Sequence, residues 1–525
     1  MRTLLFFALW FQGFVFGVSS GGPLSQTQLN MDIKHYGIHL DVDLDKKTIN
    51  GFVDISIKLL DSTRTKIELD LIDNYTVVQI RYKYKNLPFT QLKHKIYTHI
   101  PTPTQTFQLR IYYKGTPPEA KRPPWEGGFT WTSDSLGNPW IGLSCQSDGA
   151  HIWMPCKEHP SDEADSVDVY IVVKKPLSVA SNGLLVETIN QGEKKIWHWK
   201  TRYPISPYNI NFTIGKFDII ERQFELTRPT LAQYFVLAEG KSRANYILNE
   251  AEKYLKFYES IFGSYPWHKE KFGMVQTPYW GMEHQSIIAY GNNYKIREPG
   301  YDFLLLHEMG HEWWGNYLTV NDWADFWIHE GITIYAEALF IEENYGIEAY
   351  HNFFQKTVRK KISNQKAIIP KRNATASEVD GLDPYYKGAI MLHGLRYLIG
   401  KDTLLQILNE VLHSEKAMAH NHVSTKDFIR ISNEISNRDL GWFFNQYLYK
   451  KELPLLKIKK RWKKTILSWD DPKFKMPIEL EIKGKQTQKY TFETHTGKLI
   501  INSEKIKAVD PKNWLLYQKK RVFLK

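Results

Sequence analysis

Apolar and polar positions alternate over most of residues 33–217, which is the pattern of half-buried strands. The segments 36–44 and 51–57 show the alternation clearly, and turn residues separate them. Strands with one face on a core and the other in solvent are typical of antiparallel sheets. We therefore predict an N-terminal antiparallel β-sheet domain over residues 21–221.

After about residue 222 the spacing of apolar positions becomes helical. In the segment 244–262, apolar side chains recur every three or four positions, which places them on one face of a helix. The same spacing predicts a mainly helical domain over residues 222–450, with further helices at 302–316, 325–343, 386–399, 404–412, 425–435 and 440–449.

Alternation returns in the last part of the chain. The segments 478–482, 489–492 and 499–501 predict short strands, so we expect residues 451–525 to form a small β-sandwich-like domain. The chain as a whole is then of the α+β multidomain class. Its length of 525 residues agrees with several domains, and its apolar content of 42% excludes wholesale disorder.

The first 20 residues have the features of an export signal. Arg2 supplies a positive charge, an apolar stretch runs from Leu4 to Val18, and small residues follow. This stretch is short for a membrane span, and beyond it no apolar run approaches the ~18–20 residues that a span requires. We expect cleavage near Ser20 and an exported mature chain, periplasmic or secreted if the source is bacterial. An uncleaved anchor is the alternative.

Charge is distributed unevenly. The net charge is +12, and the stretch from Lys450 to Lys525 alone carries 21 Lys and Arg against 8 Asp and Glu. A solvated basic face explains this, and weak contact with anionic lipid or polysaccharide is the functional alternative. Nucleic acid is not expected as a partner, because no groove-reading motif accompanies the lysines. Two cysteines, Cys145 and Cys156, are too few for a disulfide scaffold, although they could pair in an oxidising compartment.

A candidate metal site stands in the helical region. His307, Glu308 and His311 belong to a His-Glu-Met-Gly-His segment. Histidines four positions apart share one face of a helix and can bind the same ion, and neutral imidazole suits zinc. Glu308 can then take a proton from a water molecule beside the metal. Two histidines and a glutamate on an ordinary helix face are the alternative interpretation.

A catalytic zinc site needs a third protein ligand and an open fourth position. Glu330 follows His311 by 19 positions, within a segment that is expected to form a second helix. Two histidines and one carboxylate are a catalytic donor set, not a closed structural one. Glu337 falls on the same helical face, where it either orients a ligand or is a plain carboxylate. We expect the neighbouring Trp313, Trp314 and Trp323 to serve packing.

This arrangement, His-Glu-x-x-His followed after 18 residues by Glu, resembles the aminopeptidase N family of zinc metallopeptidases (peptidase family M1), whose relatives include leukotriene hydrolase. Residues 279–284, Tyr-Trp-Gly-Met-Glu-His, look like the family's G-x-M-E-N loop. Residues 385–388, Tyr-Tyr-Lys-Gly, look like its Y-x-K-G segment. Residues 144–146, with 151–162 after them, look like the amine-site strand of its N-terminal domain.

The resemblance implies a thermolysin-like fold for the helical domain and one zinc ion per chain. It implies that His307, His311 and Glu330 hold the zinc. It also implies that Glu308 is the general base, and that Tyr385 donates a hydrogen bond to the developing oxyanion.

The resemblance also implies how a peptide binds. Glu283 is expected to pair with the free α-ammonium group of the substrate, and Gln146 to add an acceptor there. Gly281 and Met282 are expected to offer backbone groups to the peptide, and Met282 to line the first side-chain pocket.

The function implied by these residues is that of a zinc-dependent aminopeptidase, which removes the N-terminal residue from peptides with a free N-terminus. The alternatives are an epoxide hydrolase of the leukotriene-hydrolase type and a non-catalytic binding protein on the same fold. The chain departs from the family's loop at Trp280, in place of Gly, and at His284, in place of Asn. The sequence predicts neither the preferred first residue nor the oligomeric state.

Overall fold

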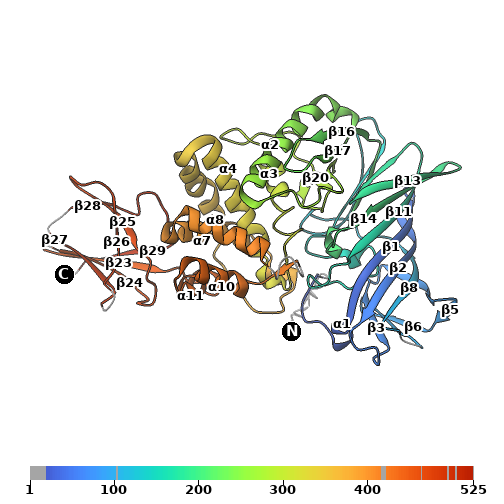
Figure 1. Cartoon of the computed structure of the whole chain (residues 1–525), viewed down its shortest axis with the longest axis horizontal. Coiled ribbons are helices and arrows are strands. Elements are labelled where there is room, and N and C mark those ends of the chain that lie inside the picture. Colours follow the sequence, from blue (N-terminus) through green and yellow to red (C-terminus); the bar gives the residue numbers. More distant parts are fainter. Residues whose placement is uncertain are drawn as a thin grey trace, which may run out of the picture.

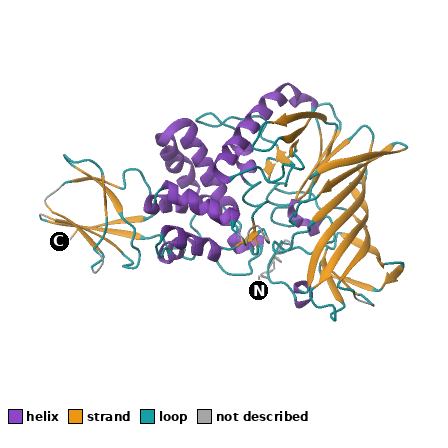
Figure 2. Cartoon of the chain, viewed as in Figure 1, coloured by secondary structure: helices purple, strands orange, loops and turns teal. Residues whose placement is uncertain are grey.

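The computed structural model describes residues 19–523, apart from 102–103, 415–420, 463, 494–495 and 503–504. The expected export signal therefore lies outside the described residues, except for its last two positions. Figure 1 shows an elongated molecule with the N-terminal sheets at one end, a helical body in the middle and a small β domain at the other end. The same regions stand out by secondary structure in Figure 2. The predicted fold class is confirmed.

An eight-stranded sheet dominates the N-terminal domain. All of its neighbouring strands are antiparallel except β1 and β11, which pair in parallel. The strand order is β13–β14–β11–β1–β2–β8–β4–β5, with β1 (Met31–Asp43), β2 (Thr48–Leu59), β4 (Tyr75–Tyr82), β5 (Lys85–Leu87), β8 (Thr106–Gly115), β11 (Ser166–Lys174), β13 (Leu184–Gln191) and β14 (Lys194–Thr201).

Two smaller sheets complete this domain, together with the short helix α1 (Gln26–Leu29). They pack with the large sheet around one core of buried apolar side chains. Their strands, in order, are β3 (Lys66–Asp70), β7 (Lys95–His99) and β6 (Phe89–Leu92) in one, and β12 (Ser178–Ser181), β15 (Phe212–Gly215), β10 (Pro139–Ser144) and β9 (Gly128–Ser133) in the other.

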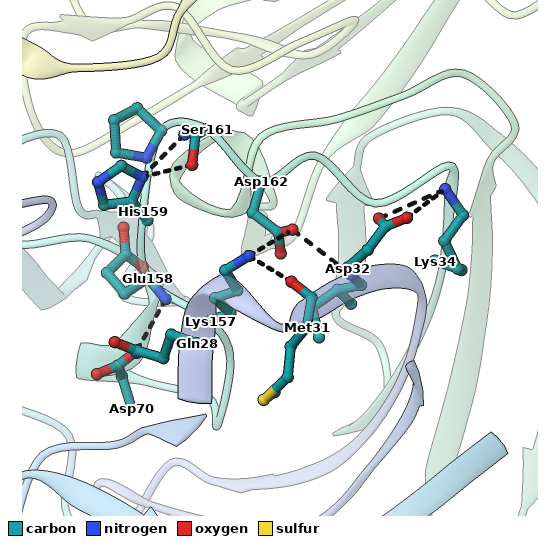
Figure 3. Close-up of polar contacts among 12 residues, drawn as sticks. Gln28, Met31, Asp32, Lys34, Asp70, Lys157, Glu158, His159, Ser161 and Asp162 are labelled. Atoms are coloured by element: carbon teal, nitrogen blue, oxygen red, sulfur yellow. Dashed lines mark hydrogen bonds and ion pairs between the residues drawn. The ribbon is translucent and has the colours of Figure 1, made fainter. Parts of the chain in front are cut away.

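Buried polar contacts fix the loop between β10 and β11 (Figure 3). The Lys157 ammonium donates to the Met31 carbonyl at 2.5 Å and to the Asp162 carboxylate at 3.1 Å. The backbone N–H of Glu158 donates to the Asp70 carboxylate at 3.0 Å. Because a buried charge is costly unless it is paired, these contacts hold the loop against the first strands of the domain.

Residues 19–22 lie between the N-terminal and helical domains. The Ser20 hydroxyl donates to the Glu158 carboxylate at 2.7 Å and accepts from the Trp323 indole N–H at 3.0 Å. The Ser20 backbone N–H donates to the Ser147 carbonyl. This short segment therefore joins both domains beside the position where we expect the mature chain to begin.

A five-stranded sheet leads into the helical domain. Its order is β16 (Asp218–Phe224), β17 (Thr230–Val236), β18 (Phe272–Gln276), β20 (Ile288–Tyr290) and β19 (Gly281–Met282). The predicted boundary between residues 221 and 222 falls inside β16, whose ladder continues into β17. The strand pairing thus assigns all of β16 to the sheet of the helical domain, while the domain limits themselves stay predictions.

The helical body follows the predicted periodicity closely. Helix α2 coincides with its predicted segment and buries one apolar face. Two short strands also pair in this domain, β21 (Thr319–Val320) and β22 (His422–Val423). The helices are α2 (Ala244–Phe262), α3 (Phe303–Gly310), α4 (Trp327–Phe353), α5 (Arg359–Lys361), α6 (Ala376–Val379), α7 (Asp383–Ile399), α8 (Lys401–His413), α10 (Thr425–Ser436) and α11 (Gly441–Leu448).

Two helices depart from the prediction by more than one residue at their C-terminal end. Helix α3 stops at Gly310 instead of continuing to residue 316, because the chain turns tightly there and Gly315 has φ +133°. Helix α4 consists of two helical segments joined by a kink at Gly346, which has φ 83°; the first segment therefore ends within a few residues of the predicted end at 343, and a second segment continues to Phe353. Among the described residues, no helix is long and apolar enough to cross a membrane.

The C-terminal domain consists of two small sheets. It shares a continuous core with the helical body, and the Arg359 guanidinium donates to the Leu515 carbonyl at 2.8 Å across the junction. The strand orders are β27–β24–β23–β29 and β26–β25–β28, with β23 (Leu455–Arg461), β24 (Lys464–Trp469), β25 (Ile478–Ile482), β26 (Gln488–Tyr490), β27 (Lys498–Asn502), β28 (Ile506–Val509) and β29 (Gln518–Phe523).

The two cysteines, Cys145 and Cys156, are buried free thiols. Burial raises the pKa of both well above the ordinary value, so neither is an activated thiolate.

Candidate metal centre and active site

Helix α3 presents the two histidines of the motif. Asp302 caps the helix by accepting from the backbone N–H of Leu305 at 3.1 Å, which sets the first turn. The Nε2 atoms of His307 and His311 lie 3.2 Å apart, as expected for residues one turn apart on the same helix face. Both side chains are largely buried, so the pair points into the protein and not into solvent.

Glu330 brings the third donor from helix α4. Its Oε2 lies 3.4 Å from the Nε2 atoms of both His307 and His311. One donor atom from each residue lies within 4.8 Å of the other two. The His311 Nδ1 atom lies 2.9 Å from the Trp314 carbonyl, a contact that requires a proton on Nδ1. Without a metal, Nε2 also carries a proton and faces Glu330; when an ion binds, Nε2 gives up that proton and becomes the lone-pair donor.

This donor set fits zinc. Two imidazole nitrogens and one carboxylate oxygen converge, and three protein ligands leave a position open for water or substrate. Burial alone would raise the pKa of Glu330, but the charge of His311 and hydrogen bonds from both histidines lower it to about 2. The carboxylate is therefore ionised, which is the form that binds a cation.

Glu308 lies in the same buried cavity, beside the metal-binding residues. Burial raises its pKa well above the ordinary value, and the negative charge of Glu283 adds to the effect. A bound cation would oppose this rise. A carboxyl group with a raised pKa can accept a proton and pass it on.

Tyr385, in the first turn of α7, also lines the cavity. Its ring centroid lies 6.4 Å from that of His307. Burial raises the pKa of Tyr385 well above the ordinary value, so the hydroxyl keeps its proton and can donate a hydrogen bond. The structure thus brings together the three metal-binding residues, Glu308 and Tyr385.

The expected amine-binding residues lie at the same cavity. Glu283 is buried, and its Oε1 has no hydrogen-bond partner among the described residues. Burial raises its pKa, and the neighbouring His311 opposes the rise. Gln146 lies at the cavity wall, where its side-chain amide donates to Glu330 at 3.4 Å. Gln146 is therefore placed to orient a metal-binding carboxylate as well as to meet an amine.

Strand β19 decides which loop residues face the cavity. Gly281 and Glu283 line it, whereas the Met282 side chain is buried in the core on the other face of the strand. The structure therefore does not bring the Met282 side chain to the wall of the cavity. His284 is also buried away from it, with its Nε2 3.3 Å from the Tyr279 hydroxyl, and burial lowers the pKa of His284 to about 3.

Aromatic side chains form much of the cavity wall, and the sequence did not single out Trp125 or Phe303 among them. Trp280 packs against Phe303 with ring centroids 5.1 Å apart, and against Trp125 of the N-terminal domain at 5.9 Å. No sequence signal marks Trp125, because it comes from a loop of a different domain. The complete lining is Pro124, Trp125, Gln146, Trp280, Gly281, Glu283, Phe303, Leu304, His307, Glu308, His311, Glu330, Ile334, Leu382, Tyr385 and Tyr386.

The remaining candidates have packing roles. Glu337 accepts from the Tyr301 hydroxyl at 2.5 Å and lies two turns along α4 from Glu330, so it does not orient a ligand directly. Trp313, Trp314 and Trp323 are buried, as expected.

Comparison with known proteins agrees with this fold and site. The Peptidase family M1 domain matches residues 246–447, and the Peptidase M1 N-terminal domain matches residues 33–209. Two histidines and one glutamate are a donor set of catalytic zinc sites, and here they lie on a helical domain that follows an N-terminal β domain. The chain belongs to peptidase family M1, as the sequence motifs predicted.

Relatives and solved structures carry names from the same family. The chain is 23% identical over 415 residues to leukotriene A-4 hydrolase of Xenopus laevis, a match that covers 70% of this chain and 63% of that protein. It is 21% identical to probable aminopeptidase 2 of Sulfurisphaera tokodaii, over 91% of this chain and 62% of the relative. The chain thus spans a little under two thirds of the length of these relatives.

An M1 zinc metallopeptidase from Deinococcus radiodurans has a similar fold, with a TM-score of 0.67 and 22% identity over 81% of this chain and 95% of that one. A mutant of that enzyme has been solved bound to a Tyr-Ser-Ala substrate, with a TM-score of 0.66, 22% identity and coverage of 80% of this chain and 94% of that one. Together with the donor set found here, the family supports zinc as the metal.

Proposed function

We propose that this protein is a zinc-dependent aminopeptidase, which hydrolyses the first peptide bond of substrates with a free N-terminus. The observation that carries the proposal is that Glu283, buried and with an unpartnered oxygen, lies in the same cavity as the His307–His311–Glu330 donor set. An ionised carboxylate in that position would hold an α-ammonium group one residue away from the site of hydrolysis.

Each polar residue of the cavity has a chemical task in this proposal. A zinc ion at His307, His311 and Glu330 would supply Lewis acidity and lower the pKa of water. Glu308 accepts the proton of the attacking water and passes it to the nitrogen of the leaving amine. Tyr385 donates its hydroxyl proton in a hydrogen bond to the oxygen of the scissile carbonyl as negative charge develops there.

Two alternatives have less support. An epoxide hydrolase would use the same metal-binding residues, but it would have no use for a buried carboxylate facing an amine. A non-catalytic binding protein would not need Glu308 and Tyr385 beside the donor set. The Glu283 carboxylate therefore favours the peptidase over both alternatives.

A panel of aminoacyl amides tests the proposal, with N-acetylated versions of the same compounds as controls. We expect hydrolysis of the free-amine compounds, little or none of the acetylated ones, and loss of turnover with a chelator. Equal hydrolysis of free and acetylated compounds would exclude an aminopeptidase, and turnover that survives complete removal of the metal would exclude a metalloenzyme.

Export and surface contact are further parts of the proposal. The Arg2 charge and the apolar stretch that follows support cleavage near Ser20, and mass spectrometry of the N-terminus of the mature protein tests it. The excess of basic residues after Lys450 supports weak contact with anionic surfaces. Retention on vesicles with 30% anionic lipid, falling as salt rises from roughly 0.01 to 0.15 M, tests this contact.

A further inference from the structure

Two cationic side chains contact residues that line the active-site cavity, and neither belongs to the machinery described above. Arg297 lies over the face of Phe303, with its guanidinium carbon 3.5 Å from the ring centroid. Lys361, at the end of α5, donates to the Tyr386 hydroxyl at 2.6 Å. Because Phe303 and Tyr386 both line the cavity, each cation contacts a residue of its wall. Burial and the nearby charge of Arg297 both lower the pKa of Lys361, so the two cations lie close to each other.

The charge of this pair is only partly neutralised. In the part of the chain that the structure describes, Glu337 has the one carboxylate within ion-pair distance of Arg297, and the two groups are 3.9 Å apart, at the limit of an ion pair. Burial raises the pKa of Glu337 to about 7, so this group is not fully ionised at neutral pH. Among the described residues, no carboxylate lies within ion-pair distance of Lys361. Arg297 and Lys361 are both half-buried, so both remain reachable from the solvent side.

Helix α4 shows where the two cations lie relative to the metal-binding residues. Glu330 binds the metal, Ile334 lines the cavity one turn later, and Glu337 meets Arg297 one further turn along. Seven residues of helix rise by about 10 Å, which equals the length of about three residues of extended chain.

The residues that are expected to bind the substrate amine lie elsewhere along the cavity. Gln146 contacts Glu330 itself, and Glu283 lies close enough to His311 for the two charges to interact. Lys361 instead lies close enough to interact with His307, on the preceding turn of α3. A peptide held by its amine at Glu283 therefore extends past the metal-binding residues toward Arg297 and Lys361.

We propose that Arg297 and Lys361 bind a carboxylate on the part of the substrate that follows the scissile bond, so that the preferred substrates are short peptides, in particular di- and tripeptides. This inference rests on the proposed aminopeptidase function and adds the substrate class to it. The aromatic wall of Trp280 and Phe303 would meet the side chain of the second residue, while the two cations meet the carboxylate.

The carboxylate has two possible sources, the C-terminus of a short peptide or an acidic side chain. Three substrates distinguish them: Ala-Ala, Ala-Ala-amide and Ala-Glu-amide, all at pH 7.5, where the carboxyl groups are ionised. We expect kcat/KM for Ala-Ala to exceed that for Ala-Ala-amide by about tenfold, mostly through KM. An advantage of Ala-Glu-amide alone would assign the site to an acidic side chain. Equal kcat/KM for all three substrates would overturn the proposal.

Variants test whether these two residues carry the preference. In Arg297→Gln and in Lys361→Met, the ratio of kcat/KM for Ala-Ala over that for Ala-Ala-amide should fall toward one. Each variant loses the attraction between its cation and the substrate carboxylate, which only Ala-Ala carries. Arg430→Gln, an exposed arginine on α10, is the matched control and should keep the wild-type ratio. A wild-type ratio in both cavity variants would show that the preference, if present, arises elsewhere.

A binding measurement separates this inference from the proposed function. Calorimetry with Glu308→Gln and the metal in place compares Ala-Ala with Ala-Ala-amide without turnover. Tighter binding of the free acid, by about tenfold, supports carboxylate recognition even if no peptide is cleaved. Equal affinity for both peptides would overturn the inference and leave the aminopeptidase proposal untouched.

Discussion

The backbone of Gly281 lies directly against the carboxylate of Glu308: a Cβ atom at position 281 would stand 2.8 Å from Glu308 Oε1 and 2.7 Å from Leu304 Cδ1. Both distances are shorter than van der Waals contact allows. A side chain at position 281 would therefore have to displace the Glu308 carboxylate and the Leu304 side chain, so the glycine leaves room for Glu308 in its present position.

Gly281→Ala is expected to lower kcat/KM for aminoacyl amides about 100-fold, because even a displacement of about 1 Å misplaces a catalytic group. Metal content should stay at one ion per chain, since the atoms nearest to the new methyl group belong to Leu304 and Glu308 and not to a metal-binding residue. Gly394→Ala is the matched control, because its Cβ would meet its nearest neighbour at 3.6 Å inside helix α7. Wild-type activity of Gly281→Ala would show that the loop can shift without moving Glu308.

Glu308→Gln is expected to keep the metal but to lower kcat by a factor between about 10² and 10⁴. The amide has the shape of the carboxyl group but cannot accept the proton. Elemental analysis and steady-state kinetics on the same sample check both halves of the prediction. A variant with full metal content and wild-type kcat would remove Glu308 from the mechanism.

Glu283→Gln should raise KM for substrates with a free α-amine and lower kcat/KM about 100-fold, since it removes one partner of a buried charge pair. The effect should vanish for N-acetylated compounds, which carry no ammonium group. If the variant cleaves free-amine substrates as well as the wild type does, the amine is bound somewhere else.

Removal of the metal is expected to lower the thermal midpoint by several degrees, because an ion held by His307, His311 and Glu330 ties α3 to α4 in the folded state only. Differential scanning calorimetry before and after dialysis against a chelator measures the shift. Zinc should restore the midpoint and magnesium should not, because magnesium prefers oxygen ligands. An unchanged midpoint in a sample shown to be metal-free would contradict this.

Asp162 links the stability of the N-terminal domain to pH. Burial raises its pKa from 3.8 to about 6, although Lys157 opposes the rise. A raised carboxyl pKa means that the folded state binds more protons than the unfolded state between these values. Its stabilising contribution is therefore complete below about pH 4 and is lost as pH rises through about 6, by at most about 3 kcal/mol.

The Asp162→Asn variant has no carboxyl group at this position, so its stability should not fall in this way as pH rises. The midpoint of urea denaturation of the wild type, measured relative to that of Asp162→Asn, should fall between pH 4 and pH 7. Asp43→Asn is a suitable control, because hydrogen bonds from the Lys46 and Asp45 backbone lower the pKa of Asp43 and keep it ionised between pH 4 and pH 7. A difference between wild type and Asp162→Asn that does not vary with pH would show that Asp162 does not titrate in this range.

Local periodicity predicted the elements well where a segment has one clearly apolar face. Helix α2 begins and ends where its pattern predicts, because Ile247, Ala251 and Tyr254 must all turn toward the same core. The end of α3 was predicted too late, because Gly310 and the turn around Gly315 end the helix while apolar residues continue. Amphipathic spacing reports burial, and it does not report where the backbone turns.

The sequence by itself determined the metal-binding residues. The spacing of His307 and His311 is a local helical property, and the resemblance to the M1 family supplied the partners Glu330, Glu308 and Tyr385.

Only the tertiary structure decided which other side chains share the cavity. Trp125 belongs to a different domain, and the Met282 side chain packs in the core while its neighbours face the cavity. Arg297 and Lys361 come from two separate segments and contact residues of the cavity wall. These placements depend on how sheets and helices pack over long sequence separations. No pattern within a short window of residues encodes them, because the forces that set them act between segments that become neighbours only in the folded chain.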